Sequence, residues 1–230
     1  MLSAVEWASR RLGHRFGDPA LLDAALTHRS ASRANYERLE FLGDAVLNFV
    51  IAELLFREYP EAEEGELSRY RAALVSSPCL AEVAAELVLG EQLRLGGGEL
   101  KSGGFRRGSI LADALEALFG AVYLDAGVEA ASGLIERLFA KRLRDLPAAE
   151  ALKDPKTRLQ EALQGRSLPL PQYALEEVSG EAHEQWFAAS CEVATLGLHS
   201  RGEGSSRRKA EQAAAERMLD ELQHIQEGRA

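Results

Sequence analysis

Cysteine is scarce in this sequence, with only Cys79 and Cys191 among 230 residues. Two thiols that lie far apart in apolar surroundings exclude a disulfide framework, and they show none of the close spacings of a zinc site. We therefore expect buried or partly buried thiols and a reducing compartment.

Long apolar runs and an excess of basic residues are also missing. No run approaches the roughly 18 apolar residues of a membrane span, and the first residues lack the apolar core of a signal peptide. A soluble cytoplasmic protein is expected. The net charge of −9 argues against a globally basic surface for nucleic acid, and neither half of the chain is basic overall. Any nucleic-acid-binding surface must therefore be a local cluster.

The remaining composition is compatible with two domains. Hydrophobic residues make up 46% of the chain, which is enough for buried cores in one large or two modest domains. Apolar periodicity lapses around residues 145–153, where a proline intervenes. We predict a helical domain over residues 1–147, a linker over 148–153, a second domain over 154–223 and a tail over 224–230.

Residues 35–56 place acids in a helix that otherwise favours burial. At about 100° per residue, one stripe about 80° wide contains Glu37, Glu40, Asp44 and Asn48. The other directions are apolar, Phe49 included, so the pattern predicts a helix that is largely surrounded by protein. Carboxylates beside a core are costly unless they are paired, hydrogen-bonded or bound to a cation.

A second acid-bearing helix is expected over residues 110–125. Asp113 and Glu116 share one face a turn apart, and Gly120 continues that face. Because glycine has no side chain, another helix could cross closely there. Such a crossing would bring together Glu40, Asp44, Asp113 and Glu116. Four acids without matching cations imply a metal ion, and all-oxygen ligands favour Mg²⁺ or Mn²⁺ over zinc or copper.

Residues 37–44, ERLEFLGD, resemble the signature of the ribonuclease III family, and the resemblance continues through Glu64-Gly65 and the second acid-bearing helix. It implies an all-α endonuclease domain that hydrolyses double-stranded RNA with Mg²⁺ and leaves staggered 5′-phosphate and 3′-hydroxyl ends. It also implies processing of ribosomal RNA precursors and of other structured transcripts, messenger and transfer RNA included. Mn²⁺ would substitute for Mg²⁺, and one-metal and two-metal catalysis both fit.

The same resemblance assigns roles to individual residues. The implied metal ligands are Glu40, Asp44, Asp113 and Glu116. The implied catalytic residues are Asp44, Glu116, Glu37 and Glu64, and spacing alone does not choose Glu64 over Glu63. The family forms homodimers through the signature helix, because cutting both strands of a duplex needs two sites. Phe41 is then a candidate interface residue, with ordinary core packing as the alternative.

Residues 154–223 predict the order α-β-β-β-α. Asp154 and Pro155 begin a short helix to residue 164, strands follow over 173–178, 186–193 and 196–201, and a last helix covers 206–223. Trp186 and Phe187 are expected to be core residues, with a base-stacking surface as the alternative. The alanine-rich face of the last helix should pack closely on the sheet. This α+β order, with the motif GEGSSRRKAEQAAAE, resembles a double-stranded-RNA-binding domain.

That resemblance implies an RNA-binding surface with three parts. Minor-groove contacts would come from Thr157, Gln160, Glu161 and His183. Phosphates would meet Ser205, Ser206, Arg207, Arg208 and Lys209. The three cations oppose the helix dipole, which makes sense if an anion docks there; a solvated basic turn is the alternative. Residues 96–108 are too rich in glycine to form regular structure. Arg106 and Arg107 in this segment either contact RNA phosphates or belong to a flexible connector.

Other functions are less well supported by the residues. Leu100 precedes Lys101 where a nucleotide-binding loop needs glycine, so nucleotide binding is rejected. A di-iron bundle needs Glu-x-x-His pairs, which neither acid-bearing helix supplies. A non-cleaving double-stranded-RNA-binding regulator would be expected to lack some of the acids of the first domain. All six acids of the family are present, so this alternative has no motif in its favour. His28 is expected to be a hydrogen-bonded structural histidine, with contact to the chemistry as the alternative.

Overall fold

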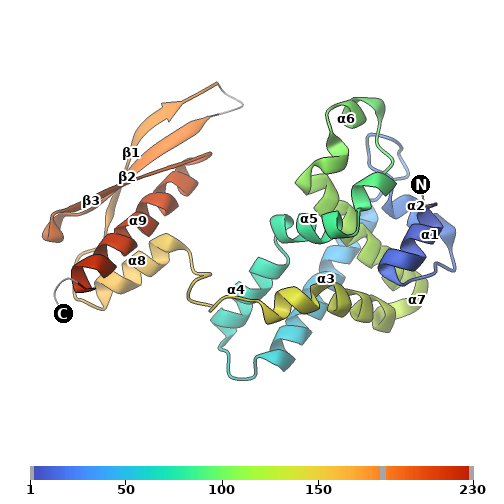
Figure 1. The fold of residues 1–230 in the computed structure, drawn as a ribbon, viewed down its shortest axis with the longest axis horizontal. Coiled ribbons are helices and arrows are strands. Elements are labelled where there is room, and N and C mark those ends of the chain that lie inside the picture. The colour runs from blue at the N-terminus through green and yellow to red at the C-terminus, as the bar shows by residue number, and fades with distance from the viewer. Residues whose placement is uncertain (1–2, 182–184, 228–230) are drawn as a thin grey trace. The chain divides into compact units, whose positions relative to one another are not determined.

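The computed structural model describes residues 3–181 and 185–227 (Figure 1). The chain divides into two compact units, Met1–Ala149 and Glu150–Ala230. The predicted RNA contact His183 lies outside the described residues.

The first unit is helical. Its α-helices are α1 (Ala4–Trp7), α2 (Pro19–Ala25), α3 (Glu37–Glu58), α4 (Glu64–Leu74), α5 (Ser77–Glu86), α6 (Gly97–Lys101) and α7 (Gly108–Arg144). Shorter helical segments are η1 (Ala8–Leu12), η2 (Leu89–Gln92) and η3 (Gly104–Arg106). The expectation that residues 96–108 are irregular is therefore wrong for α6 and η3. Glycine still permits the tight turn between them, since Gly103 has a φ of 78°, a conformation that favours glycine.

Helix α7 forms the centre of the first unit and packs against α2, α3 and α5. Its buried residues include Leu115, Leu118 and Phe119, and α3 contributes Leu47 and Ile51. Length and apolar composition would also suit a membrane span. However, α7 is the core helix of its unit, and Gly127 interrupts it with a φ of 84°, a conformation that favours glycine.

Helix α3 has an exposed apolar face. The exposed fractions are 82% for Phe41, 58% for Phe49 and 74% for Phe56. The expectation that protein largely surrounds this helix is therefore wrong for the single chain, and so is the assignment of Phe49 to the core. The helix packs on α7, α4 and α2, and these three aromatic residues lie on a side that no described residue of the first unit covers.

The second unit has the predicted order of elements. It consists of α8 (Pro155–Gln164), β1 (Gln172–Ser179), β2 (Trp186–Val193), η4 (Ala194–Leu196), β3 (Leu198–Gly204) and α9 (Arg207–Glu227). The strands form one antiparallel sheet in the order β1-β2-β3. Helix α9 lies against this sheet (Figure 1). It extends beyond residue 223, because the sequence offers no glycine or proline before Gly228.

Contacts in the second unit confirm two packing predictions and correct a third. The Asp154 side chain accepts the Lys156 N–H at 2.9 Å, as a helix cap should. A Cβ on Gly202 would lie 2.4 Å from the Ala210 carbonyl oxygen, so the alanine face of α9 does approach the sheet closely. Trp186, expected in the core, is 49% exposed because it lies at the end of β2.

Candidate active site

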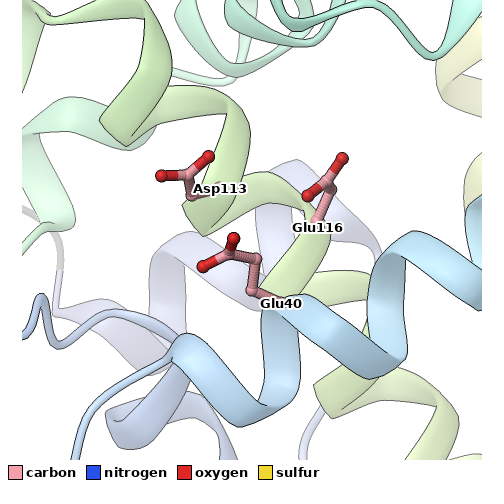
Figure 2. A group of neighbouring side chains, drawn as sticks. All are labelled: Glu40, Asp113 and Glu116. Carbon is pink, nitrogen blue, oxygen red and sulfur yellow. The ribbon is translucent and has the colours of Figure 1, made fainter.

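Three carboxylates from two helices meet at one place. Glu40 comes from α3, and Asp113 and Glu116 come from α7 (Figure 2). Each offers an oxygen, and these oxygens all lie within 4.8 Å of one another. All three residues are half-buried. In the described chain no Lys, Arg or His forms an ion pair with any of them.

A backbone contact between α3 and α7 brings these acids together. A Cβ on Gly43 would lie 1.7 Å from the Glu116 carbonyl oxygen, and one on Gly120 would lie 2.3 Å from the Leu39 carbonyl oxygen. Any side chain at either position would push the helices apart. The close crossing predicted at Gly120 is thus confirmed, and Gly43 is its partner on α3.

Burial, and for Glu40 and Glu116 the neighbouring negative charges as well, raises the pKa values of these acids. Burial, followed by the charges of Asp44, Glu40 and Asp113, raises the pKa of Glu116 to about 8. Burial is also the largest cause of the raised pKa values of Glu40 and Asp113. Acids held together at this cost, with oxygen as their only donor atom, suit a hard divalent cation.

Asp44, the fourth predicted metal ligand, lies outside this group of three. It is exposed one turn beyond Glu40, and its carboxylate accepts a hydrogen bond from Asn48 Nδ2 at 2.8 Å. Its charge nevertheless contributes to the raised pKa of Glu116. Asp44 therefore borders the group of three.

The other two predicted acids lie in different surroundings. Glu37 lines the pocket beside the carboxylates and pairs with Arg29 at 3.4 Å. Glu64 begins α4 and accepts a hydrogen bond from the Ser68 hydroxyl at 2.8 Å. Among the described residues, Glu64 belongs neither to the carboxylate group nor to its pocket.

The pocket over Glu40 and Asp113 has a volume of about 390 Å³. Its lining includes His28, Arg29, Tyr36, Glu99 and Arg107. Of these, Arg29, Tyr36 and Glu99 were not identified from the sequence. Tyr36 directly precedes the acid-bearing helix, but its sequence position does not show which way its side chain points.

The two arginines of the glycine-rich segment differ in their environment. Arg107 lines the pocket and pairs with Glu99 at 2.7 Å. The Arg106 guanidinium lies 5.0 Å from the centre of the Phe105 ring. Of the two, only Arg107 lies beside the acids.

In the second unit, the predicted RNA contacts of α8 and α9 lie at the surface. Thr157, Gln160 and Glu161 are exposed on α8, and Glu161 pairs with Lys153 at 2.7 Å. Ser206 is half-buried and its hydroxyl accepts the Lys209 N–H at 3.2 Å.

The cations that begin α9 are exposed but partly paired. Arg207 Nε donates to Glu211 at 2.8 Å, and Arg208 lies 3.4 Å from Asp154. Lys209 Nζ donates to the exposed Ser205 hydroxyl at 3.2 Å. The Arg207 contact uses Nε, so the two terminal nitrogens of its guanidinium remain available for a phosphate.

Comparison with known protein families shows to which family the chain belongs. Residues 18–143, more than half of the chain, match the family described as Ribonuclease-III-like. The chain belongs to the ribonuclease III family. Residues 155–222 match the double-stranded RNA binding motif.

Relatives within the ribonuclease III family cover the chain almost completely. Ribonuclease 3 of Vibrio vulnificus is 53% identical, over 96% of this chain and 99% of its own. Ribonuclease 3 of Nitrosococcus oceani is 57% identical, over 95% of each chain. The nuclease domain of ribonuclease III from Campylobacter jejuni superposes with a TM-score of 0.60 at 42% identity, over 64% of this chain and 100% of that one.

Family membership and the two matched regions establish the class of activity. The chain is a ribonuclease III endoribonuclease, a hydrolase of double-stranded RNA, with a helical nuclease domain followed by an RNA-binding domain. The ribonuclease III family is metal-dependent, and the carboxylate group on α3 and α7 is a suitable place for a metal ion.

Proposed function

We propose that this ribonuclease III uses Mg²⁺ held by Glu40, Asp44, Asp113 and Glu116 to hydrolyse double-stranded RNA, leaving staggered 5′-phosphate and 3′-hydroxyl ends. The supporting observation is the approach of three carboxylate oxygens within 4.8 Å of one another, with no ion-pairing cation among the described residues. Mn²⁺ also prefers oxygen ligands, so it should substitute for Mg²⁺.

Each acid has a distinct part in this proposal. A bound divalent cation lowers the pKa of its water and offsets charge on the phosphate. Glu116, whose pKa is raised to about 8, gains the most from a cation and is the indispensable ligand. Asp113 and Glu40 complete the half-buried part of the site, and Asp44, which is exposed one turn beyond Glu40, would have to turn toward the cation to complete the ligand set. Glu37 lines the pocket beside these ligands, and Glu64, at the start of α4, is assigned a catalytic role by the family resemblance.

The RNA duplex would be held by the second domain and by the loop beside the acids. Thr157, Gln160, Glu161 and His183 are proposed to contact minor grooves, and the serines and cations that begin α9 to contact phosphates. In the nuclease domain, Arg107 is the better placed of the two loop arginines, since it lines the acid pocket.

We further propose that the protein acts as a homodimer through the exposed aromatic face of α3. Phe41, Phe49 and Phe56 place three large apolar side chains on that face. Exposed apolar patches of this kind typically mark protein interfaces. A related structure, the nuclease domain of ribonuclease III from Campylobacter jejuni, is described as flexible in a region that is involved in dimer formation. Two subunits would supply the two sites that a staggered cut of a duplex needs.

The proposed substrates are precursors of ribosomal RNA and other structured transcripts, including messenger and transfer RNA. The proposed compartment is the cytoplasm. Both cysteines are free, which agrees with a reducing environment.

Cleavage of a perfectly paired RNA tests the metal proposal. The duplex should be longer than the length that one RNA-binding domain covers, which is about 16 base pairs. Wild type should give staggered products with 5′-phosphates in Mg²⁺ and none in EDTA. Glu116→Gln should bind the duplex without cutting it. Glu129→Gln, which neutralises an exposed acid of the same helix, should cut normally.

The opposite outcome has a defined meaning. If wild type binds the duplex but cuts it with neither Mg²⁺ nor Mn²⁺, the chain is a non-cleaving regulator. The carboxylate group would then need another explanation.

A further inference from the structure

Two buried aromatic residues of the acid pocket have polar atoms without a partner in the described chain. His28 is 8% exposed and Tyr36 is 2% exposed. Their rings pack edge to face, with centroids 5.6 Å apart. Neither His28 Nε2 nor the Tyr36 hydroxyl bonds to a described protein group, and neither is among the enclosed polar atoms that lack a partner. These two atoms therefore open into the pocket that both residues line.

The other edge of the His28 ring is fixed by hydrogen bonds. The Ser30 backbone N–H donates to Nδ1 at 3.1 Å, and the Ser30 hydroxyl lies 2.7 Å from the same atom. Because a backbone N–H can only donate, Nδ1 is an acceptor and the ring proton lies on Nε2. The Ser30 hydroxyl oxygen in turn accepts a hydrogen bond from the Gly96 N–H at 2.9 Å. His28 therefore offers an N–H donor to the pocket.

The Tyr36 hydroxyl is a second donor. Burial raises the pKa of Tyr36, and the charges of Asp113 and Glu40 raise it further. The hydroxyl consequently keeps its proton at any physiological pH. Tyr36 lines the same pocket as these two carboxylates.

We propose that His28 Nε2–H and Tyr36 O–H, which bond to no described carboxylate in this structure, are positioning donors that would hold carboxylate or water oxygens beside Asp113 once a cation is bound. Carboxylates carry acceptors only, so oxygens crowded at one site need donors to fix their orientation. Partners of this kind outside the direct ligands typically change metal affinity by 10- to 100-fold. The inference rests on the proposed metal site and adds two residues to it.

The first test is Mn²⁺ binding to the full chain without RNA, followed by electron paramagnetic resonance. Tyr36→Phe removes one oxygen and keeps the ring, so it should weaken Mn²⁺ binding by roughly tenfold. It should also raise the Mg²⁺ concentration needed for half-maximal cleavage. Tyr70→Phe changes a buried tyrosine of α4 outside the pocket and should leave both values unchanged.

The second test uses two replacements of His28. The amide of Gln reaches about as far as Nε2, whereas the amide of Asn replaces only Nδ1 and can still meet Ser30. His28→Gln should therefore retain most of the Mn²⁺ affinity, and His28→Asn should lose it. A role in folding alone would not separate these two variants. If one of them fails to fold, Tyr36→Phe still decides the question.

The outcomes separate this inference from the metal proposal. Unchanged Mn²⁺ affinity in Tyr36→Phe, or an effect only on RNA binding, would overturn the donor role while the metal site stands. If wild type shows no Mn²⁺ binding that Glu116→Gln removes, the metal site fails and the donor role fails with it.

Discussion

Replacement of Glu116 by Gln should stabilise the metal-free protein at alkaline pH. The pKa of Glu116 is raised from 4.5 to about 8 by burial and then by the charges of Asp44, Glu40 and Asp113. Below about pH 4.5 the carboxyl is protonated in both the folded and the unfolded chain, so it causes no penalty. As the pH rises, only the unfolded chain releases the proton readily, and the folded state loses stability until about pH 8.

The size of this penalty can be bounded. At 1.36 kcal/mol per pKa unit, the difference between 4.5 and about 8 gives an upper limit of roughly 5 kcal/mol. Glu116 is only half-buried, so solvent screening should reduce this to roughly 1–3 kcal/mol. For a domain of this size, that corresponds to about 2–12 °C in the melting temperature.

The assay is thermal unfolding in EDTA at about pH 4 and about pH 9. Glu116→Gln should match wild type at the lower pH and exceed it at the higher one, and Glu129→Gln should show no such difference. Added Mg²⁺ should then stabilise wild type more than Glu116→Gln, because a ligand stabilises the state that binds it. Equal melting temperatures of Glu116→Gln and wild type at about pH 9 would refute the charge-crowding argument.

Three further predictions concern the helix crossing, the aromatic face and the RNA surface. Gly43→Ala should destabilise the nuclease domain by about 3 kcal/mol or more in chemical denaturation. Gly133→Ala, at an open position of α7, should cause no such loss. Equal effects of the two substitutions would contradict the argument that the two helices are in direct contact at Gly43. Phe49→Glu should shift the protein to monomers in sedimentation, and an unchanged dimer would exclude this face. Arg207→Gln should weaken RNA binding and reduce its salt slope by about 1; an unchanged slope would mean that Arg207 meets no phosphate.

Helical periodicity was sufficient to locate the acid-bearing helices but not their surroundings. The helix predicted over residues 35–56 is observed as α3, and the acids at positions 40, 113 and 116 lie together as predicted. Apolar residues also follow the periodicity of α3 on the side away from α7, so the pattern could not distinguish a face that meets its own chain from one left exposed. Phe49 was misplaced for this reason.

Contacts distant in sequence determined what the sequence could not predict. The orientation of His28 depends on Ser30 and on Gly96, which lies 66 positions away from Ser30. No local pattern specifies such a pairing. The Asp44–Asn48 bond, by contrast, follows from their spacing of four residues on one helix and could have been anticipated.

Because α3 and α7 cross in direct contact, the distance between the carboxylates of the site depends on the side-chain length of each acid. At Gly43 and Gly120 the main chains are in contact, with no side chain between them that could adjust. Neither helix can move closer to compensate for an acid that is one methylene shorter. Charge-conserving exchanges of Asp and Glu at positions 40 and 116 therefore alter the width of the gap between the carboxylates, and only side-chain rotation is left to close it.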